Sequence, residues 1–387
     1  MNKPVKEKKK ITKKHKQIIL VTCLIVVITA AISLGLWGGF YYQYGSNLTI
    51  ESTEAKNIII MVGDGMGFNH IEAAKIKKKL DSMNMEKLDV HGQIRTRSLS
   101  IAPTDSAAAA TALATGYKVK NGEIGMTGKK TYENIFEFAK QKGKKVGFVT
   151  TTNAYDASIA AFSSHVRDKN MHDEIIKQQI ESDIDLIIGI GKDKYEPYAD
   201  QIETEDRAYC KTLQEIKKAG IQKKKIFAVL DDELTERSEN KLKEIVSFAA
   251  NALENDNNNG YVLLVEGAKI DTYSHQNDIM NMIEELSEFD RAVGHLKERA
   301  EGNSDTFMIV TSYYETGDLR IKNIEDATVE NMEKENWFHS KKHTRDDVPF
   351  FAIGPGSTEI PSNKPLDNTD IFDICKQLIE NYASSSS

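Results

Sequence analysis

Residues 57–67 read NIIIMVGDGMG and decide the fold that the sequence predicts. The apolar and β-branched residues 57–63 are typical of a strand that is buried on both faces. Asp64 follows this run directly, and the neighbouring glycines let the backbone turn sharply and approach a ligand. Their spacing does not match the G-x-G-x-x-G dinucleotide fingerprint. The stretch therefore predicts a buried strand that ends in a functional aspartate or in an ordinary turn aspartate.

Six further apolar runs repeat this pattern along the chain. They cover residues 145–152, 185–191, 225–230, 261–267, 306–312 and 349–356. Long helical patterns lie between several of them, at 132–142, 240–254, 278–300 and 370–382. Alternating strands and helices form a parallel sheet, because each crossover helix packs on a face of that sheet. We therefore expect an α/β fold, a three-layer α/β/α sandwich around a mostly parallel sheet.

The composition limits the size of the core and the class of partner. The 387 residues are 40% hydrophobic, enough for one large domain or two small ones. The net charge is −7, and residues 1–17 hold eight lysines and one glutamate, so the rest of the chain carries about −14. This acidic body argues against nucleic acid as a partner. The three cysteines are widely spaced and indicate neither a zinc knuckle nor a disulfide framework.

The N-terminus has the pattern of a membrane anchor. Residues 18–42 contain no charged side chain and are long enough to cross a bilayer as a helix. Lysines before this run and few after it predict a cytoplasmic N-terminus and an extracytoplasmic body at the cell membrane. A cleaved signal peptide, or a lipoprotein site at Cys23, is the alternative. We expect a basic segment at 1–17, a transmembrane signal-anchor helix at 18–42, a linker at 43–55, the folded domain at 56–383 and a disordered tail at 384–387.

A second motif, TDSAAAATALATG, covers residues 104–116. Its alanines favour a helix, and Gly116 is suited to end it. Thr104, Asp105 and Ser106 lie at the N-terminus of this helix, where a hydroxyl meets free backbone N–H groups and the positive end of the helix dipole. The motif predicts either a site for an anion such as phosphate or an ordinary N-cap.

Other polar residues follow apolar runs or share a helix face. Asp271 and His275 are four residues apart, which places a carboxylate and an imidazole on one face of a helix. Such a pair can bind zinc, although the same spacing also occurs in surface pairs. The remaining candidates, each near the end or the start of an apolar run, are Asp156, Ser158, Glu266 and His343.

The combination of these residues, in this order, resembles the alkaline phosphatase family. The resemblance runs from about Asn57 to the C-terminus and rests on the segments NIIIMVGDGMG, TDSAAAATALATG, VEGAKIDTYSH and HTRDDVPFFAIGPG. The C/S-x-P-x-R nucleophile motif of the related sulfatases is absent from the sequence. The resemblance implies the α/β/α fold and the hydrolysis of phosphate monoesters of small molecules.

The resemblance also implies a role for each motif residue. Ser106 matches the serine that attacks phosphorus and becomes a phosphoserine, which water then hydrolyses. One zinc, which binds the leaving oxygen and later activates water, has its ligands matched by Asp271, His275 and His343. A magnesium site, built from the hard oxygen ligands that this ion prefers, has its positions matched by Asp64, Asp156, Ser158 and Glu266.

Two motifs depart from the family pattern. The family's T-A-D-H-E-T-G motif, whose Asp and His hold a second zinc beside the serine, reads TSYYETG at residues 311–317, with Tyr313 and Tyr314 in place of the two ligands. A phenol with a pKa near 10 is a poor ligand and is bulky, so we expect the two rings to fill the place of that zinc. The family's phosphate-binding arginine aligns with Lys169, and Arg167 is a second candidate.

These departures leave two functions open. The first is a slow phosphomonoesterase that uses one zinc and one magnesium, or that recruits His70 or His339 as a replacement ligand. The alternative is a pseudophosphatase that keeps the fold and binds phosphate or a phosphorylated ligand. Family members are often dimers, so a homodimer is a further expectation from the resemblance.

Overall fold

The computed structural model describes residues 48–51, 53–220, 224–230, 240–321, 328–335 and 337–385, together with Thr22 and Thr29. The expected basic segment and the expected membrane helix therefore lie outside the described residues, apart from those two threonines. Within the residues that are described, no helix is both long enough and apolar enough to cross a membrane.

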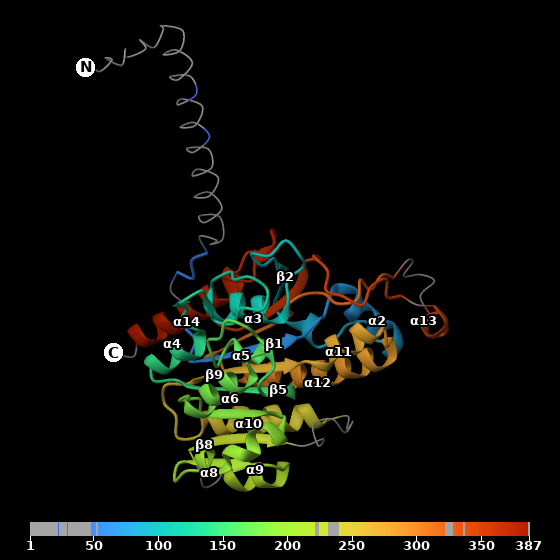
Figure 1. Cartoon of the computed structure of the whole chain (residues 1–387). Coiled ribbons are helices and arrows are strands. Elements are labelled where there is room, and N and C mark those ends of the chain that lie inside the picture. Colours follow the sequence, from blue (N-terminus) through green and yellow to red (C-terminus); the bar gives the residue numbers. More distant parts are fainter. Residues whose placement is uncertain are drawn as a thin grey trace, which may run out of the picture. The chain divides into compact units, whose positions relative to one another are not determined.

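Ten strands of the described chain form one sheet (Figure 1). Their order across the sheet is β12 (Leu366–Asp367), β2 (Val90–Arg95), β11 (Val348–Ile353), β10 (Thr306–Thr311), β1 (Asn57–Gly63), β9 (Tyr261–Gly267), β5 (Lys145–Asn153), β6 (Leu186–Ile190), β8 (Lys225–Leu230) and β7 (Arg207–Cys210). Neighbouring strands are parallel except at β11, which runs antiparallel to both β10 and β2. The sheet is therefore mostly parallel, as the alternation of strands and helices predicted.

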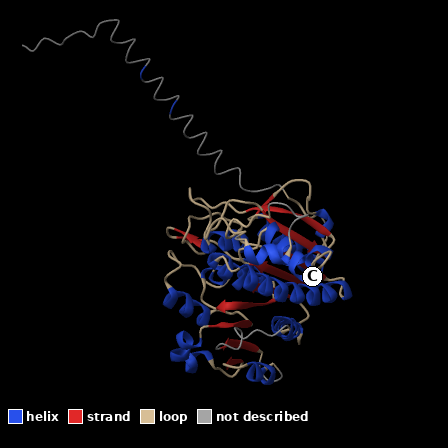
Figure 2. Cartoon of the chain, turned by 90° about the vertical axis from the view of Figure 1, so that its right-hand side faces the viewer, coloured by secondary structure: helices blue, strands red, loops and turns tan. Residues whose placement is uncertain are grey.

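Separate layers of helices cover the two faces of the sheet (Figure 2). One apolar cluster joins the first face to α3 (Ser106–Thr115), α4 (Ile135–Gln141), α6 (His172–Glu181) and α14 (Asp370–Ser385). A second cluster joins the other face to α2 (Phe68–Lys78), α10 (Lys241–Glu254), α11 (Lys269–Gln276) and α12 (Ile279–Gly302). The three-layer α/β/α sandwich is confirmed.

Shorter elements connect these layers. The remaining helices are α5 (Ala157–Ala160), α7 (Lys192–Tyr195), α8 (Ala199–Ile202), α9 (Leu213–Ala219) and α13 (Val329–Lys334). Single 3₁₀ turns form at η1 (Met85–Lys87), η2 (Glu196–Tyr198) and η4 (Ser357–Glu359), and a small hairpin pairs β3 (Met126–Thr127) with β4 (Lys130–Thr131).

The buried central strands match the apolar runs closely. β1, β8 and β9 have the predicted bounds, and β5, β6, β10 and β11 differ only at their ends. The sequence did not predict β2, β7 and β12. β2 reads VHGQIR and mixes exposed with buried positions, and β12 has two residues, so neither produces a continuous apolar run. The four long helical patterns correspond to α4, α10, α12 and α14.

The structure places two expected boundary segments differently. Part of the expected linker packs on α14, where Ile50 is buried and its N–H donates to Gln377 Oε1 at 2.9 Å. Ala55 N–H donates to Leu378 O on the same helix at 3.3 Å. At its other end α14 continues to Ser385, which lies within the expected disordered tail. Burial of an apolar side chain in a polar segment accounts for the first difference.

Candidate functional site

The carboxyl ends of β1, β9 and β10 lie side by side in the middle of the sheet. Directly after β1, Asp64 N–H donates to Gly267 O at the end of β9 at 3.2 Å. Gly65 follows with a φ of 75°, and a Cβ at this position would lie 2.9 Å from Asp271 Cα. Only glycine suits both the positive φ and the close approach. The turn therefore brings Asp64 beside α11, the helix that carries Asp271.

Three expected zinc ligands come together near the carboxyl ends of these strands. Asp271 and His275 lie one turn apart on α11, and His275 Nε2 is 3.3 Å from Asp271 Oδ2. His343, from the segment before β11, places its Nε2 3.2 Å from His275 Nε2 and 3.7 Å from Asp271 Oδ1. All three offer a ligand atom within 4.8 Å of one another. We refer to them as the three-ligand cluster.

Hydrogen bonds behind the two histidines set their orientation. His275 Nδ1 lies 2.6 Å from Lys341 O, and His343 Nδ1 lies 2.8 Å from Thr104 O. A carbonyl oxygen only accepts, so each Nδ1 carries a proton and each Nε2 lone pair faces the cluster. Two imidazoles and one carboxylate are a ligand set that catalytic zinc sites use. The donor set of this chain therefore fits zinc.

Ser106 is the first residue of α3, and its neighbour caps the helix. Asp105 is the N-cap, and its Oδ1 accepts a hydrogen bond from Ala108 N–H at 3.0 Å. The capping role therefore belongs to the aspartate and leaves the serine hydroxyl free for another contact. Ser106 Oγ lies 2.6 Å from the hydroxyl of Tyr314.

The two candidate cations for phosphate binding lie in different environments. Lys169 Nζ is 3.0 Å from Asp105 Oδ2, beside the N-terminus of α3, and its side chain is 38% exposed. Arg167 is exposed. The structure thus pairs Lys169 with Asp105, the neighbour of Ser106.

The two tyrosines are buried between the expected metal positions. The Tyr314 ring stacks on His343 with 3.7 Å between centroids and 16° between planes, while its hydroxyl contacts Ser106. Burial raises the pKa of Tyr314 well above its usual value, and the charges of Asp271 and Asp64 raise it further. Burial likewise raises the pKa of Tyr313, with Glu266 and Asp64 adding to the effect. Both phenols therefore stay neutral near pH 7, which makes them weak ligands for zinc.

A second group of acidic side chains lies at the carboxyl ends of β1 and β9. Glu266 is fully buried, its Oε2 accepts a hydrogen bond from Thr150 Oγ1 at 2.5 Å, and its Oε1 has no partner among the described residues. Burial raises the pKa of Glu266 to about 7, against the opposing effect of hydrogen bonds from Ser158 and Thr150. Burial raises the pKa of Asp64 well above its usual value, and the charges of Asp271 and Glu266 add to this. A divalent cation bound to these oxygens would favour their ionised forms, and magnesium suits them.

Asp156 precedes α5 and follows the end of β5. Its Oδ2 accepts a hydrogen bond from Thr152 Oγ1 at 2.6 Å, and its Oδ1 accepts a longer one from Asn153 Nδ2 at 3.4 Å. Burial, and after it the charges of Asp156 and Asp271, raise the pKa of Glu266. A shared magnesium site for Asp64, Asp156, Ser158 and Glu266 stays a prediction.

Comparison with known proteins gives the family. A family model described as alkaline phosphatase matches residues 55–233 and 227–338. The chain belongs to the alkaline phosphatase family. Alkaline phosphatase 4 of Bacillus subtilis is 29% identical over 326 residues, which cover 77% of this chain and 70% of that protein. The repressible alkaline phosphatase of Saccharomyces cerevisiae is 30% identical over 362 residues, which cover 81% of this chain and 63% of that protein.

Solved alkaline phosphatase structures share the fold. The enzyme from the Antarctic bacterium TAB5 matches with a TM-score of 0.75 and 27% identity, over 85% of this chain and 99% of that chain. A variant of the TAB5 enzyme, at 26% identity and a TM-score of 0.75, has Mg bound in the M3 site. The family and these relatives support a metal-dependent phosphate monoester hydrolase.

The two histidines considered as replacement ligands do not join this alkaline phosphatase site. His70 is fully buried, its Nδ1 accepts from Gly67 N–H at 3.2 Å, and its Nε2 lies 3.1 Å from Ser274 Oγ. Both ring nitrogens are therefore already used. His339 is exposed. A replacement zinc ligand from either residue is thus not supported by the structure.

Sequence reasoning missed residues that support the expected ligands. Thr316 donates a hydrogen bond to Asp271 Oδ1, and Thr150 donates one to Glu266 Oε2. Ser274, between the two ligands on α11, links that helix to His70. Thr316 lies in the 311–317 motif and Thr150 near the end of a predicted strand, and both positions indicate a place near the site. The carboxylate that each hydroxyl contacts cannot be assigned without the fold.

The burial of His70 predicts a pH-dependent stability. Its pKa is lowered from 6.5 to about 4, chiefly by burial, so the unfolded chain takes up a proton at higher pH than the folded chain. Stability is therefore complete above about pH 6.5 and falls as the pH decreases toward 4, by about 3 kcal/mol in total. Urea unfolding of metal-free protein between pH 7.5 and 4.5 should show this slope, and His70→Gln should reduce it. An unchanged slope in the variant would contradict the assignment.

The three-ligand cluster predicts one tight zinc site. His343→Ala is expected to weaken zinc binding by more than about a hundredfold, because it removes a direct ligand. Loss of a residue that only hydrogen-bonds to a ligand already lowers metal affinity by about tenfold to a hundredfold. Competition with a fluorescent chelator measures the affinity. His339→Ala is the matched control, since this exposed imidazole belongs to the same loop region and should leave zinc affinity unchanged. Equal zinc affinities for the His343 variant and the unmodified protein would exclude the cluster as the zinc site.

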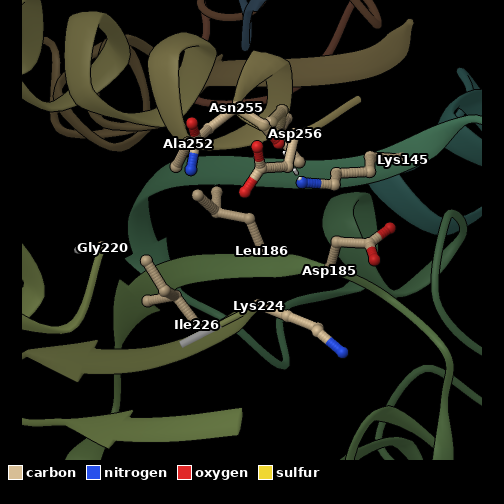
Figure 3. Close-up of a pocket in the computed structure, with 10 residues that line it drawn as sticks. Lys145, Asp185, Leu186, Gly220, Lys224, Ile226, Ala252, Asn255 and Asp256 are labelled. Carbon is tan, nitrogen blue, oxygen red and sulfur yellow. Dashed lines mark hydrogen bonds between the residues drawn. The ribbon is translucent and has the colours of Figure 1, made fainter. Parts of the chain in front are cut away.

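A cavity of about 260 Å³ lies at the amino ends of the strands (Figure 3). Lys145, in its lining, is the first residue of β5, and Asp185 immediately precedes β6, so the cavity is at the amino ends of the strands. The Lys145 ammonium donates to Asn255 O at 2.6 Å, also within the lining. The phosphatase residues follow the carboxyl ends of the strands, so this cavity is separate from their site.

Proposed function

We propose that the protein is a phosphomonoesterase that forms a phosphoserine at Ser106, with zinc and magnesium as its cofactors. One observation carries the proposal. The Ser106 hydroxyl lies at the N-terminus of a ten-residue helix, and the tyrosine that it contacts stacks on His343 of the three-ligand cluster. A nucleophile, anion-binding N–H groups and a zinc ligand set in one place are the requirements for phosphoryl transfer.

The groups of this chain have distinct tasks in two displacement steps. Ser106 Oγ attacks phosphorus as the bond to the ester oxygen breaks. The serine hydroxyl loses its proton to solvent, and the leaving ester oxygen takes a proton from solvent to become the alcohol. Water then attacks the phosphoserine and releases inorganic phosphate, and Ser106 Oγ regains a proton. The first N–H groups of α3 and the ammonium of Lys169 bind the phosphate oxygens, because both favour negative charge. Zinc and magnesium, when bound, supply Lewis acidity and lower the pKa of coordinated water.

We expect a slow enzyme, because Tyr313 and Tyr314 replace the ligands of the second zinc. A metal at the reacting centre contributes several kcal/mol, and about 1.4 kcal/mol is a tenfold change in rate. The contact between Tyr314 and Ser106 favours the second candidate function, a pseudophosphatase that binds phosphate or a phosphorylated ligand. In that case the phenol holds the nucleophile in place of an activating ion.

Trapping the covalent intermediate separates these functions. Full-length protein loaded with zinc and magnesium is mixed with p-nitrophenyl phosphate, quenched in acid and digested. Phosphate on the Ser106 peptide, together with release of nitrophenol, is expected for the phosphatase. Phosphate binding without either signal would identify the pseudophosphatase and reject the catalytic proposal.

We also infer a location from the N-terminal sequence. The uncharged segment 18–42 and its flanking lysines support a single membrane anchor with a cytoplasmic N-terminus and an extracytoplasmic phosphatase domain. Protease added to intact cells should remove the domain, and protection would place it inside. A homodimer stays a prediction that light scattering of the purified protein can check.

A further inference from the structure

Of the buried oxygen atoms that lack a hydrogen-bond partner within the described residues, three lie at the carboxyl ends of three adjacent strands. They are Asp64 Oδ1 after β1, Glu266 Oε1 on β9 and the Tyr313 hydroxyl after β10. Their residues are 6%, 0% and 1% exposed, so bulk water does not satisfy these atoms. A buried polar atom without a partner costs free energy, so the three atoms indicate a missing polar group.

The pleat of the sheet places the three side chains on the same face. Alternate residues of a strand share a face, and one apolar cluster contains Ile58, Ile60 and Val62 of β1, Val262 and Leu264 of β9, and Phe307 and Ile309 of β10. Asp64, Glu266 and Tyr313 continue these three series toward the carboxyl ends. Val62 pairs with Glu266 on one side and with Thr311 on the other, which sets the three series in one register.

Two hydrogen bonds attach the loop after β1 to the chain at the ends of β9 and β10. Asp64 N–H donates to Gly267 O after Glu266, and Met66 N–H donates to Ser312 Oγ before Tyr313 at 3.0 Å. The loop that carries Asp64 is thereby attached to both neighbouring strands. The residues that carry the three oxygens therefore lie at one junction of adjacent strands.

One cation can satisfy all three atoms at once, because two carboxylate oxygens and a phenol oxygen each offer a lone pair to it. We propose that the Tyr313 hydroxyl is a direct ligand of the Mg²⁺ held by Asp64 and Glu266. Magnesium takes hard oxygen ligands and retains several waters, so a neutral hydroxyl beside two carboxylates suits it. This assignment rests on the magnesium site of the proposed function and gives Tyr313 a binding role in it.

Magnesium titration of metal-free, full-length protein tests the assignment without any substrate. Tyr313→Phe keeps the ring and removes the hydroxyl, and it is expected to weaken Mg²⁺ binding by at least about tenfold in calorimetry. The same variant should melt at a higher temperature than the unmodified protein when no metal is present, because a buried unpaired hydroxyl is gone. Added MgCl₂ should raise its melting temperature by less than it raises that of the unmodified protein.

Tyr261→Phe is the matched control. Tyr261 is equally buried but lies at the amino end of β9, far along the strand from Glu266. Its variant should therefore bind Mg²⁺ as the unmodified protein does. Equal Mg²⁺ affinity in the Tyr313 variant would overturn the proposal. Absence of Mg²⁺ binding to the unmodified protein, or equal weakening in both variants, would overturn it too. Failure of catalysis is recorded separately, since no step of this test uses a phosphate ester.

Discussion

Ser106→Ala is expected to lower the turnover of p-nitrophenyl phosphate by about a thousandfold or more, because covalent catalysis loses its nucleophile. The fold should survive, since Asp105 rather than Ser106 provides the N-cap of α3 and alanine is the best helix former. The variant should also bind zinc and magnesium as before, because Ser106 belongs to neither group of expected ligands. Initial rates with saturating metal, compared at equal protein concentration, measure the effect.

The control for this substitution removes a serine hydroxyl elsewhere. Ser182, at the end of α6, donates only to the nearby Gln179 O at 2.7 Å, so Ser182→Ala should retain full turnover. Turnover of the Ser106 variant equal to that of the unmodified protein would show that any phosphatase activity arises from another residue. Phosphoserine formation at Ser106 would then be excluded.

The double variant Tyr313→Asp, Tyr314→His is expected to raise turnover by about a hundredfold or more, since it restores both ligands of the second zinc and several kcal/mol of transition-state stabilisation. Zinc content should rise from about one to about two ions per chain. We expect Asp64, at the end of the neighbouring strand β1, to supply a third ligand. Plasma emission spectrometry of dialysed protein measures the metal, and p-nitrophenyl phosphate measures the rate.

Two buried aromatic rings are lost in this variant, so folding must be followed with activity. Replacing a buried aromatic side chain by a small one costs about 3–5 kcal/mol, and metal binding offsets part of this loss. Tyr314→Phe is the matched single variant, because it removes the contact with Ser106 but adds no ligand, and its zinc content should stay unchanged. If the folded double variant gains neither zinc nor rate, the two tyrosines are not the cause of an incomplete site.

Local sequence patterns were sufficient for much of the site. The four-residue spacing of Asp271 and His275 holds on α11, because α-helical geometry places such residues on one face. The TDS motif begins α3 where predicted, although Asp105 is the cap and Ser106 is available for other contacts. Asp156 was expected at magnesium, which stays a prediction, and its carboxylate accepts hydrogen bonds from Thr152 and Asn153. A sequence motif does not show such local partners.

The sequence by itself determined the α/β sandwich, the strand ends that carry polar residues and the helix that begins at Ser106, because each depends on the period or the caps of a single element. Only the tertiary structure decided where the two phenols lie. Ser106 and Tyr314 are 208 residues apart and meet at 2.6 Å, while the Tyr313 hydroxyl has no hydrogen-bond partner among the described residues. Strand register and burial across β1, β9 and β10 set these contacts, and both are properties of elements packed together rather than of any one segment.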